Sequence, residues 1–312
     1  MNRTLAILLR IVLIGVIGLL LWFFIHEIEW DKLGDALRDA RLWPLLPAVA
    51  IAFAMLWCQA FGLRVMLQPR FEVSTRRLFR YTIAAYAGSV IAPLRAGELI
   101  RLWLLKQRHD VPVADSAAAV VALKFVDVVT MIVFVAPLPL LLPDVPAWVG
   151  RVILAGAAIA VGVFVVLYLA LGHLEGRVQR TGLARFIAGM HVLRSPRRLA
   201  LVVAALLAAW LVDLAMVSFV LYAVGIDLPI AAGLLILMSL NLTIAVPTPA
   251  NLGALEVGVF AATRLLHVAD ERALAFALLY HACLVVPILV AGLALELQIL
   301  LGREPAMDRR PP

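Results

Sequence analysis

Apolar runs of roughly 20 residues recur along the whole chain, and each is long enough to cross a lipid bilayer as an α-helix. The runs lie near residues 5–25, 43–66, 113–136, 148–171, 199–223 and 274–300. Because they are continuous and do not alternate between apolar and polar residues, they predict helices and not the strands of a membrane barrel. The expected fold is an all-α, polytopic membrane helix bundle with about six full spans.

The composition supports a membrane protein. The 312 residues are 64% hydrophobic and 15% charged, whereas soluble domains are nearer half apolar and a quarter charged. The net charge of +7 resides in short loops between spans, which is the ordinary topology signal, so we expect no nucleic-acid binding. Cys58 and Cys283 lie within apolar runs, which indicates neither a disulfide framework nor a metal cluster. The chain has no P-loop motif for nucleotide hydrolysis.

Two further regions, 78–107 and 230–267, contain paired apolar arms separated by Pro and Gly. Each could be two short spans, one broken span or a re-entrant hairpin. If both are re-entrant, most of the 27 Lys and Arg residues face the cytoplasm. A full crossing by the first region would turn the arginine-rich loop at 172–198 outward, against the positive-inside bias. We therefore expect two hairpins and cytoplasmic termini. The residues left at membrane depth are Arg95, Lys124 and Arg264.

This topology predicts one transmembrane domain, residues 1–312, with an internal symmetry. Each half reads span, hairpin, span, and the hairpins face opposite sides, as in inverted-repeat transporters whose broken helices form the substrate site. The segment at 27–41 is charged and amphipathic, and is either a helix on the membrane surface or an ordinary connector. The expected parts are residues 1–42 (an uncleaved first span and this segment), 43–136 (repeat 1), 148–171 (a linking span) and 199–301 (repeat 2).

The first predicted hairpin has the tip A-P-L-R-A-G-E-L-I-R, in which Pro93 and Gly97 interrupt the helix. A helix that restarts near Gly97 presents free N–H groups and a positive dipole end, which suit an anion. Arg95 could bind a phosphate with two hydrogen bonds. Glu98 could neutralise Arg95 or carry a proton, and Arg101 could steer anions from the cytoplasmic mouth. The alternative is a cytoplasmic loop with solvated charges.

Other ionisable residues interrupt the apolar spans. Lys124 and Asp127 are three residues apart and share a helix face. They form either a structural ion pair or a headgroup contact with an orienting or protonatable partner. His281 could serve packing, proton relay or headgroup contact. Asp213 could pair with Lys124 or with His281.

The second predicted hairpin has the tip V-P-T-P-A-N-L-G-A-L-E, which includes Asn251, Gly253 and Glu256. The tip has either a structural or a substrate-binding role, and Glu256 is the strongest functional candidate. Asn241 in the preceding arm could hydrogen-bond across the hairpin. No metal-ligand spacing and no nucleophile–base pair stands out, so we expect no metal, cofactor or catalytic residue.

Four motifs together resemble the lysylphosphatidylglycerol synthase transmembrane-region family, also called flippase-like integral membrane proteins. They are A-P-L-R-A-G-E-L-I-R, L-K-F-V-D-V-V, V-P-T-P-A-N-L-G-A-L-E and L-L-Y-H-A-C-L-V-V-P, and they extend over nearly the whole chain. The chain departs from the family pattern at two places. Leu123 and Lys124 stand where the family has Glu-Arg before the aspartate, and His281 stands where an arginine is usual.

The resemblance implies lipid handling, either flipping of aminoacylated phosphatidylglycerol or movement of hopanoid or polyprenyl-linked lipids. The synthase activity of the family belongs to a separate soluble domain, which we expect to be absent. The expected function is a lipid transporter of the bacterial inner membrane that binds a phosphate-containing headgroup and is not an enzyme. A homo-oligomer or a lipid-synthesis enzyme is a possible partner. The alternatives are a membrane-embedded lipid-modifying enzyme and a non-transporting subunit of an envelope-biosynthesis complex.

Overall fold

The regular elements of the described chain are all helices, which confirms the all-α prediction. The structure is a computed structural model. It describes residues 28–68, 70–91, 97–143, 146–174, 191–244 and 251–300, together with Leu19, Trp22, His26 and Thr248.

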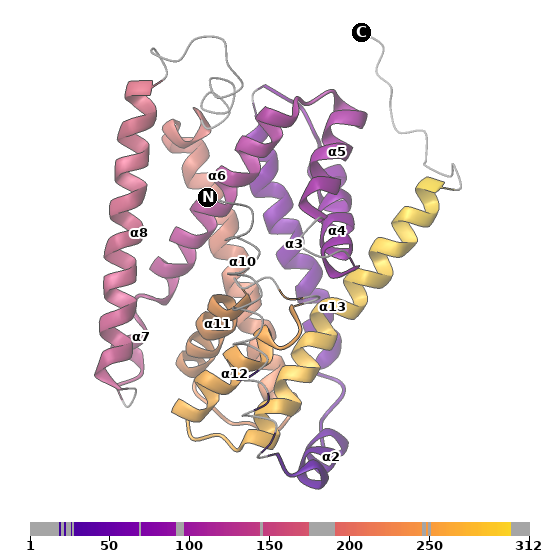
Figure 1. Cartoon of the computed structure of the whole chain (residues 1–312), viewed down its shortest axis with the longest axis vertical. Coiled ribbons are helices and arrows are strands. Elements are labelled where there is room, and N and C mark those ends of the chain that lie inside the picture. Colours follow the sequence, from indigo (N-terminus) through magenta and orange to yellow (C-terminus); the bar gives the residue numbers. More distant parts are fainter. Residues whose placement is uncertain are drawn as a thin grey trace.

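Five helices within these residues are long and apolar enough to cross a membrane. They are α3 (Leu45–Leu67), α6 (Val113–Val135, continued by the short α7, Leu138–Leu141), α8 (Ala147–Leu174), α10 (Pro196–Ala223) and α13 (Asp270–Leu300). They confirm five of the predicted spans, and the predicted span at 5–25 lies almost wholly outside the described residues. In Figure 1, α3 and α10 pack along each other inside the bundle, while α8 lies at one edge beside α6.

Each of the two interrupted regions forms a helical hairpin. The first consists of α4 (Thr75–Ile91) and α5 (Gly97–His109), and the second of α11 (Ile230–Ile244) and α12 (Ala254–Leu265). The longest arm, α4, has 17 residues, which corresponds to about 25 Å and is shorter than the hydrocarbon core of about 30 Å. The α4–α5 hairpin occupies the upper half of the bundle and the α11–α12 hairpin the lower half, and the chain enters them from opposite ends (Figure 1).

Glycines allow the two arms of each hairpin to pack closely. A Cβ atom at Gly97 in α5 would meet the carbonyl oxygen of Ala85 and would lie 2.6 Å from the backbone nitrogen of Ser89. At Gly258 in α12, a Cβ atom would lie 2.6 Å from the Cα atom of Leu240 and 2.8 Å from the carbonyl oxygen of Ser239. In a membrane the lipid tails are as apolar as the side chains, so the hydrophobic effect contributes little to association between helices. Membrane helices gain van der Waals packing energy instead, and small residues such as glycine allow the close backbone approach that this requires.

The predicted amphipathic segment contains the helix α2 (Trp30–Arg38). Leu33 is its buried residue, and the helix packs against α13 at the lower end of the bundle (Figure 1). A short 3₁₀-helix, η2 (His191–Arg194), precedes α10 at the other end. Two apolar clusters form the buried core. The larger is centred on α10, α11, α12 and α13, and the second joins α3, α4, α5 and α6 to the first half of α10.

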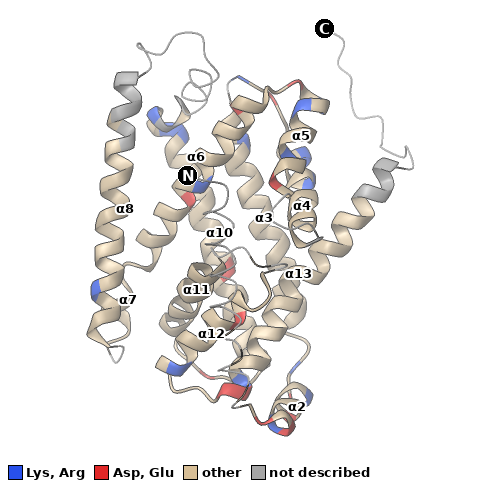
Figure 2. Ribbon diagram, in the orientation of Figure 1, with Lys and Arg blue, Asp and Glu red and all other residues tan. Residues whose placement is uncertain are grey.

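The charged residues are distributed unequally between the two ends of the bundle. Basic residues predominate at the upper end, while acidic and basic residues are mixed at the lower end (Figure 2). The basic residues on the elements that meet at the upper end are Arg64, Arg70, Arg76, Arg77, Arg80, Lys106, Arg108, Arg194, Arg197 and Arg198. The lower end includes α2 and the turn between α12 and α13, where Asp and Glu offset Lys and Arg.

Candidate functional site

The second hairpin tip leads into α12 through two residues with left-handed backbone angles. Asn251 has φ 60° and Gly253 has φ 79°, a region that glycine and, less often, asparagine adopt. The backbone N–H of Gly253 donates a hydrogen bond to Oε2 of Glu256 at 2.7 Å. Since the first N–H groups of a helix have no partner within the helix, Glu256 satisfies one donor at the start of α12.

Glu256 also joins the hairpin to a neighbouring span. Its second oxygen, Oε1, lies 3.1 Å from Nδ1 of His281 on α13. Glu256 is 5% exposed and His281 is 8% exposed, so little water competes for this contact. The structure thus brings together two predicted site residues that are 25 positions apart in the chain.

The residue before His281 makes a second buried contact. Tyr280 donates a hydrogen bond from its hydroxyl group to Oδ1 of Asp213 on α10, at 2.7 Å. Both side chains are buried. Asp213 thus has a tyrosine as its partner, and the structure shows no ion pair of Asp213 with Lys124 or His281 among the described residues. Tyr280 was not among the predicted site residues, although its position between apolar residues and beside His281 was a signal.

The first hairpin places an ion pair at the start of α5. Arg95 lies outside the described residues, and Gly97 is the first residue of α5. Glu98 pairs with Arg101 one turn later in the same helix. The Arg101 side chain is 4% exposed and the Glu98 side chain is 39% exposed. Arg101 is therefore buried in the hairpin and is not an exposed cation at its mouth.

Arg101 retains hydrogen-bonding capacity. Its Nε atom is buried and has no hydrogen-bond partner. A buried guanidinium group normally forms several hydrogen bonds, since an unmet donor costs about 1–3 kcal/mol. With the first N–H groups of α5 nearby in the same helix, this end of the hairpin has the donors and the positive charge that an anion requires.

The remaining predicted site residues are less closely connected. Lys124 is exposed on α6 and Asp127 is half-buried, and no ion pair joins the two in the described part of the chain. Asn241 donates a hydrogen bond to the carbonyl oxygen of Leu237 at 2.9 Å, within its own helix α11. No bond of Asn241 across the hairpin occurs among the residues that the structure describes. In the residues that the structure describes, no group of three potential metal ligands occurs.

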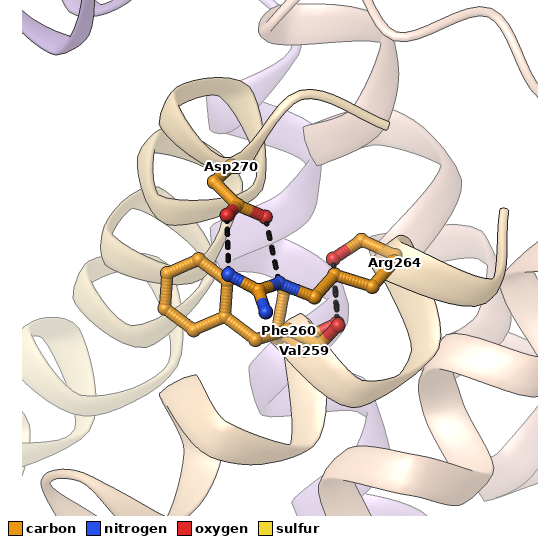
Figure 3. A network of polar contacts seen from close by, with 5 residues as sticks. Val259, Phe260, Arg264 and Asp270 are labelled. Atoms are coloured by element: carbon orange, nitrogen blue, oxygen red, sulfur yellow. Dashed lines mark hydrogen bonds and ion pairs between the residues drawn. The ribbon is translucent and has the colours of Figure 1, made fainter. Parts of the chain in front are cut away.

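Arg264 lies at the base of the second hairpin, where α12 ends. It is in the last turn of α12 and binds Asp270 in the first turn of α13. Figure 3 shows both bonds, which join Nε to Oδ1 at 3.2 Å and Nη2 to Oδ2 at 2.7 Å. The turn between them is short, so this pair joins the end of α12 to the start of α13.

The comparison with known families agrees with this arrangement. The model of the lysylphosphatidylglycerol synthase TM region matches residues 7–292. The chain belongs to this family. The matched residues include both hairpins and extend into α13, so the resemblance expected from the four motifs is confirmed. The lysylphosphatidylglycerol synthase family and the five apolar helices together indicate a multi-pass membrane protein with a role in lipid handling. None of the curated proteins compared matches the chain.

Proposed function

We propose that this chain moves an amphipathic lipid with a phosphate-containing headgroup across or within the bilayer, without changing the lipid covalently. The observation that supports this most is the pair of short hairpins that enter from opposite ends of the bundle (Figure 1). Each hairpin has a buried charged residue near the start of its second arm, Arg101 in α5 and Glu256 in α12. Broken helices of this kind form the substrate sites of inverted-repeat transporters. Family membership supports a lipid as the substrate.

In this proposal the headgroup phosphate binds at the start of α5. The first N–H groups of α5 and the buried Arg101 provide the donors, and Glu98 is displaced from Arg101 when the phosphate binds. Arg95, in the preceding segment, makes the first contact. The acyl chains stay in the bilayer, so only the headgroup requires a polar path. Lys124 and Asp127 on α6 line that path from the side.

The second hairpin provides the opposite end of the path. Asn251 and Gly253 lie just before α12 and Glu256 in its first turn. A carboxylate at this position attracts the amine of an aminoacylated or ethanolamine-type headgroup once its bond to His281 opens. Anionic and zwitterionic lipids therefore both fit the proposal.

The charge distribution and the packing support an orientation and a transport cycle. The basic upper end faces the cytoplasm of a bacterial inner membrane under the positive-inside rule, which puts both termini inside.

The repeats 43–136 and 199–301 are related by inversion. In each repeat the last span can pack against the first hairpin arm of the other repeat. These two equivalent contacts differ, because α13 packs extensively against α4 whereas α6 packs only slightly against α11. Exchange of these two packings would alternate access to the headgroup site.

The direct test is lipid transfer in liposomes that contain the purified protein and fluorescently labelled phosphatidylglycerol or phosphatidylethanolamine, with bleaching of the outer leaflet by dithionite. We expect wild-type protein to accelerate transfer of at least one lipid. Arg101→Lys keeps the charge but loses the planar donor group, and should slow transfer roughly tenfold. The matched control is Arg38→Gln on α2, where the arginine side chain is 84% exposed.

Two results would overturn the proposal. One is a wild-type rate equal to that of protein-free liposomes, which favours a non-transporting subunit of an envelope-biosynthesis complex. The other is chemical conversion of the labelled lipids on thin-layer chromatography, which favours a lipid-modifying enzyme. Equal transfer by wild-type and Arg101→Lys proteins of equal thermal stability would remove Arg101 from the site.

A further inference from the structure

The contact between α12 and α13 depends on a histidine. Nδ1 of His281 and Oε1 of Glu256 are 3.1 Å apart, and Oε2 of Glu256 holds the N–H of Gly253 at 2.7 Å. One carboxylate thus connects the start of α12 to the middle of α13. A histidine side chain can take up or release a proton, so this contact has one form with a charged imidazole and one with a neutral imidazole.

Two charged groups on the elements that pack around this contact have partners of their own. On α10, Asp213 is bonded to Tyr280, and α11 contains no charged residue. Arg264 on α12 is eight residues from Glu256, about 12 Å along the helix, and is bonded to Asp270. The other titratable groups on packed elements are Arg197, Arg198 and Tyr222 of α10; Tyr81, Tyr86, Arg76, Arg77 and Arg80 of α4; Cys58 and Arg64 of α3; Asp31, Lys32, Asp35 and Arg38 of α2; and Asp270, Glu271, Arg272 and Cys283 of α13.

Protonation changes the strength of the contact. Protonated His281 forms a charge-assisted hydrogen bond and an ion pair with Glu256, at a site from which water is largely excluded. Neutral His281 can still donate a hydrogen bond from Nδ1 to the carboxylate, but the attraction between two opposite charges is lost, and that attraction is strong where water is excluded. Because Gly253 and Glu256 begin α12, loosening this contact frees the hairpin tip from α13.

We propose that the His281–Glu256 contact is a proton-dependent latch that holds the tip of the second hairpin against α13. Protonation closes the latch and deprotonation opens it. This inference rests on the proposed function in one respect: an open latch frees the Glu256 carboxylate for the headgroup, so lipid transfer should be faster at higher pH. The latch itself is a structural property and can be measured without lipid transfer.

The decisive experiment is hydrogen–deuterium exchange of the reconstituted full chain at pH 5.5 and pH 8.0, with correction for the intrinsic chemical exchange rate. In wild-type protein, a peptide that contains residues 251–258 should exchange on the order of tenfold more slowly at pH 5.5. A peptide from α10 should show no such change. His281→Arg has a permanent charge and should protect the tip at both pH values, whereas His281→Gln should leave it unprotected at both.

Equal corrected exchange of the wild-type tip at both pH values would overturn the latch. An unchanged pH effect in His281→Gln would overturn the assignment to His281. Lipid transfer measured on the same samples separates this inference from the proposed function. Tip protection that follows pH in proteins without transfer supports the latch and contradicts the transporter. Transfer without any pH effect on the tip contradicts the latch alone.

Discussion

Gly258 of α12 lies so close to Leu240 of α11 that a Cβ atom at residue 258 would come within 2.6 Å of the Leu240 Cα atom. Two helix backbones therefore touch in the second hairpin, as they do at Gly97 in the first. The hairpins are held together by backbone contact between their arms, and the tips are positioned by that packing.

Substitution of this glycine should loosen the second hairpin. We expect Gly258→Ala to lower the free energy of unfolding by about 1–3 kcal/mol, because the added methyl group meets backbone atoms that cannot move aside. Thermal unfolding in detergent, followed by scanning fluorimetry, checks the effect. Gly162→Ala on α8 is the matched control, since nothing lies within 4 Å of the new atom. Equal melting temperatures for the two variants would contradict the close packing.

The bond between Tyr280 and Asp213 should contribute to stability. Tyr280→Phe keeps the ring but removes the donor from a buried carboxylate, and we expect a loss of about 1–3 kcal/mol. Tyr222→Phe, whose side chain is 47% exposed, should change stability by less than about 0.5 kcal/mol. If Tyr280→Phe unfolds at the wild-type temperature, the Tyr280 hydroxyl does not stabilise Asp213.

The paired bonds between Arg264 and Asp270 should fix the turn from α12 to α13. The side chains are 32% and 20% exposed, so solvent weakens the pair, and we expect Arg264→Ala to cost about 1 kcal/mol. A double-mutant cycle with Asp270→Ala measures the coupling. Strictly additive effects would show that the two residues do not interact in the membrane.

The free energy of unfolding should decrease when the pH is lowered, and His109 at the end of α5 should contribute to this decrease. Burial, reinforced by Arg77 and Arg108, lowers the pKa of His109 below its ordinary value of 6.5. The folded protein then binds fewer protons than the unfolded chain, so the contribution of His109 is full above pH 6.5 and is lost as the pH falls toward the lowered pKa. His109→Gln should show a smaller stability loss between pH 7.5 and 5.5. The same slope in both proteins would exclude His109 as its source.

The sequence predicted the elements better than the contacts between them. Apolar run length is a local property, so five spans were found within a few residues of their observed bounds. Pro and Gly marked both hairpins for the same reason. The partners of Asp213 and Glu256 are 67 and 25 residues away, and only the packing of α10, α12 and α13 determines them. The bond of Arg264 to Asp270 was not predicted either, because it depends on how the chain turns from α12 into α13.

Photo-crosslinking in liposomes tests most directly whether the lipid headgroup passes the hairpin tips. The probe is phosphatidylglycerol with a diazirine on its headgroup, and the adducts are mapped by mass spectrometry on wild-type protein. The account predicts adducts on residues 97–101 and 251–258, and fewer on residues 97–101 in Arg101→Lys. Adducts confined to the outer face of α8 and to the ends of the bundle would contradict it.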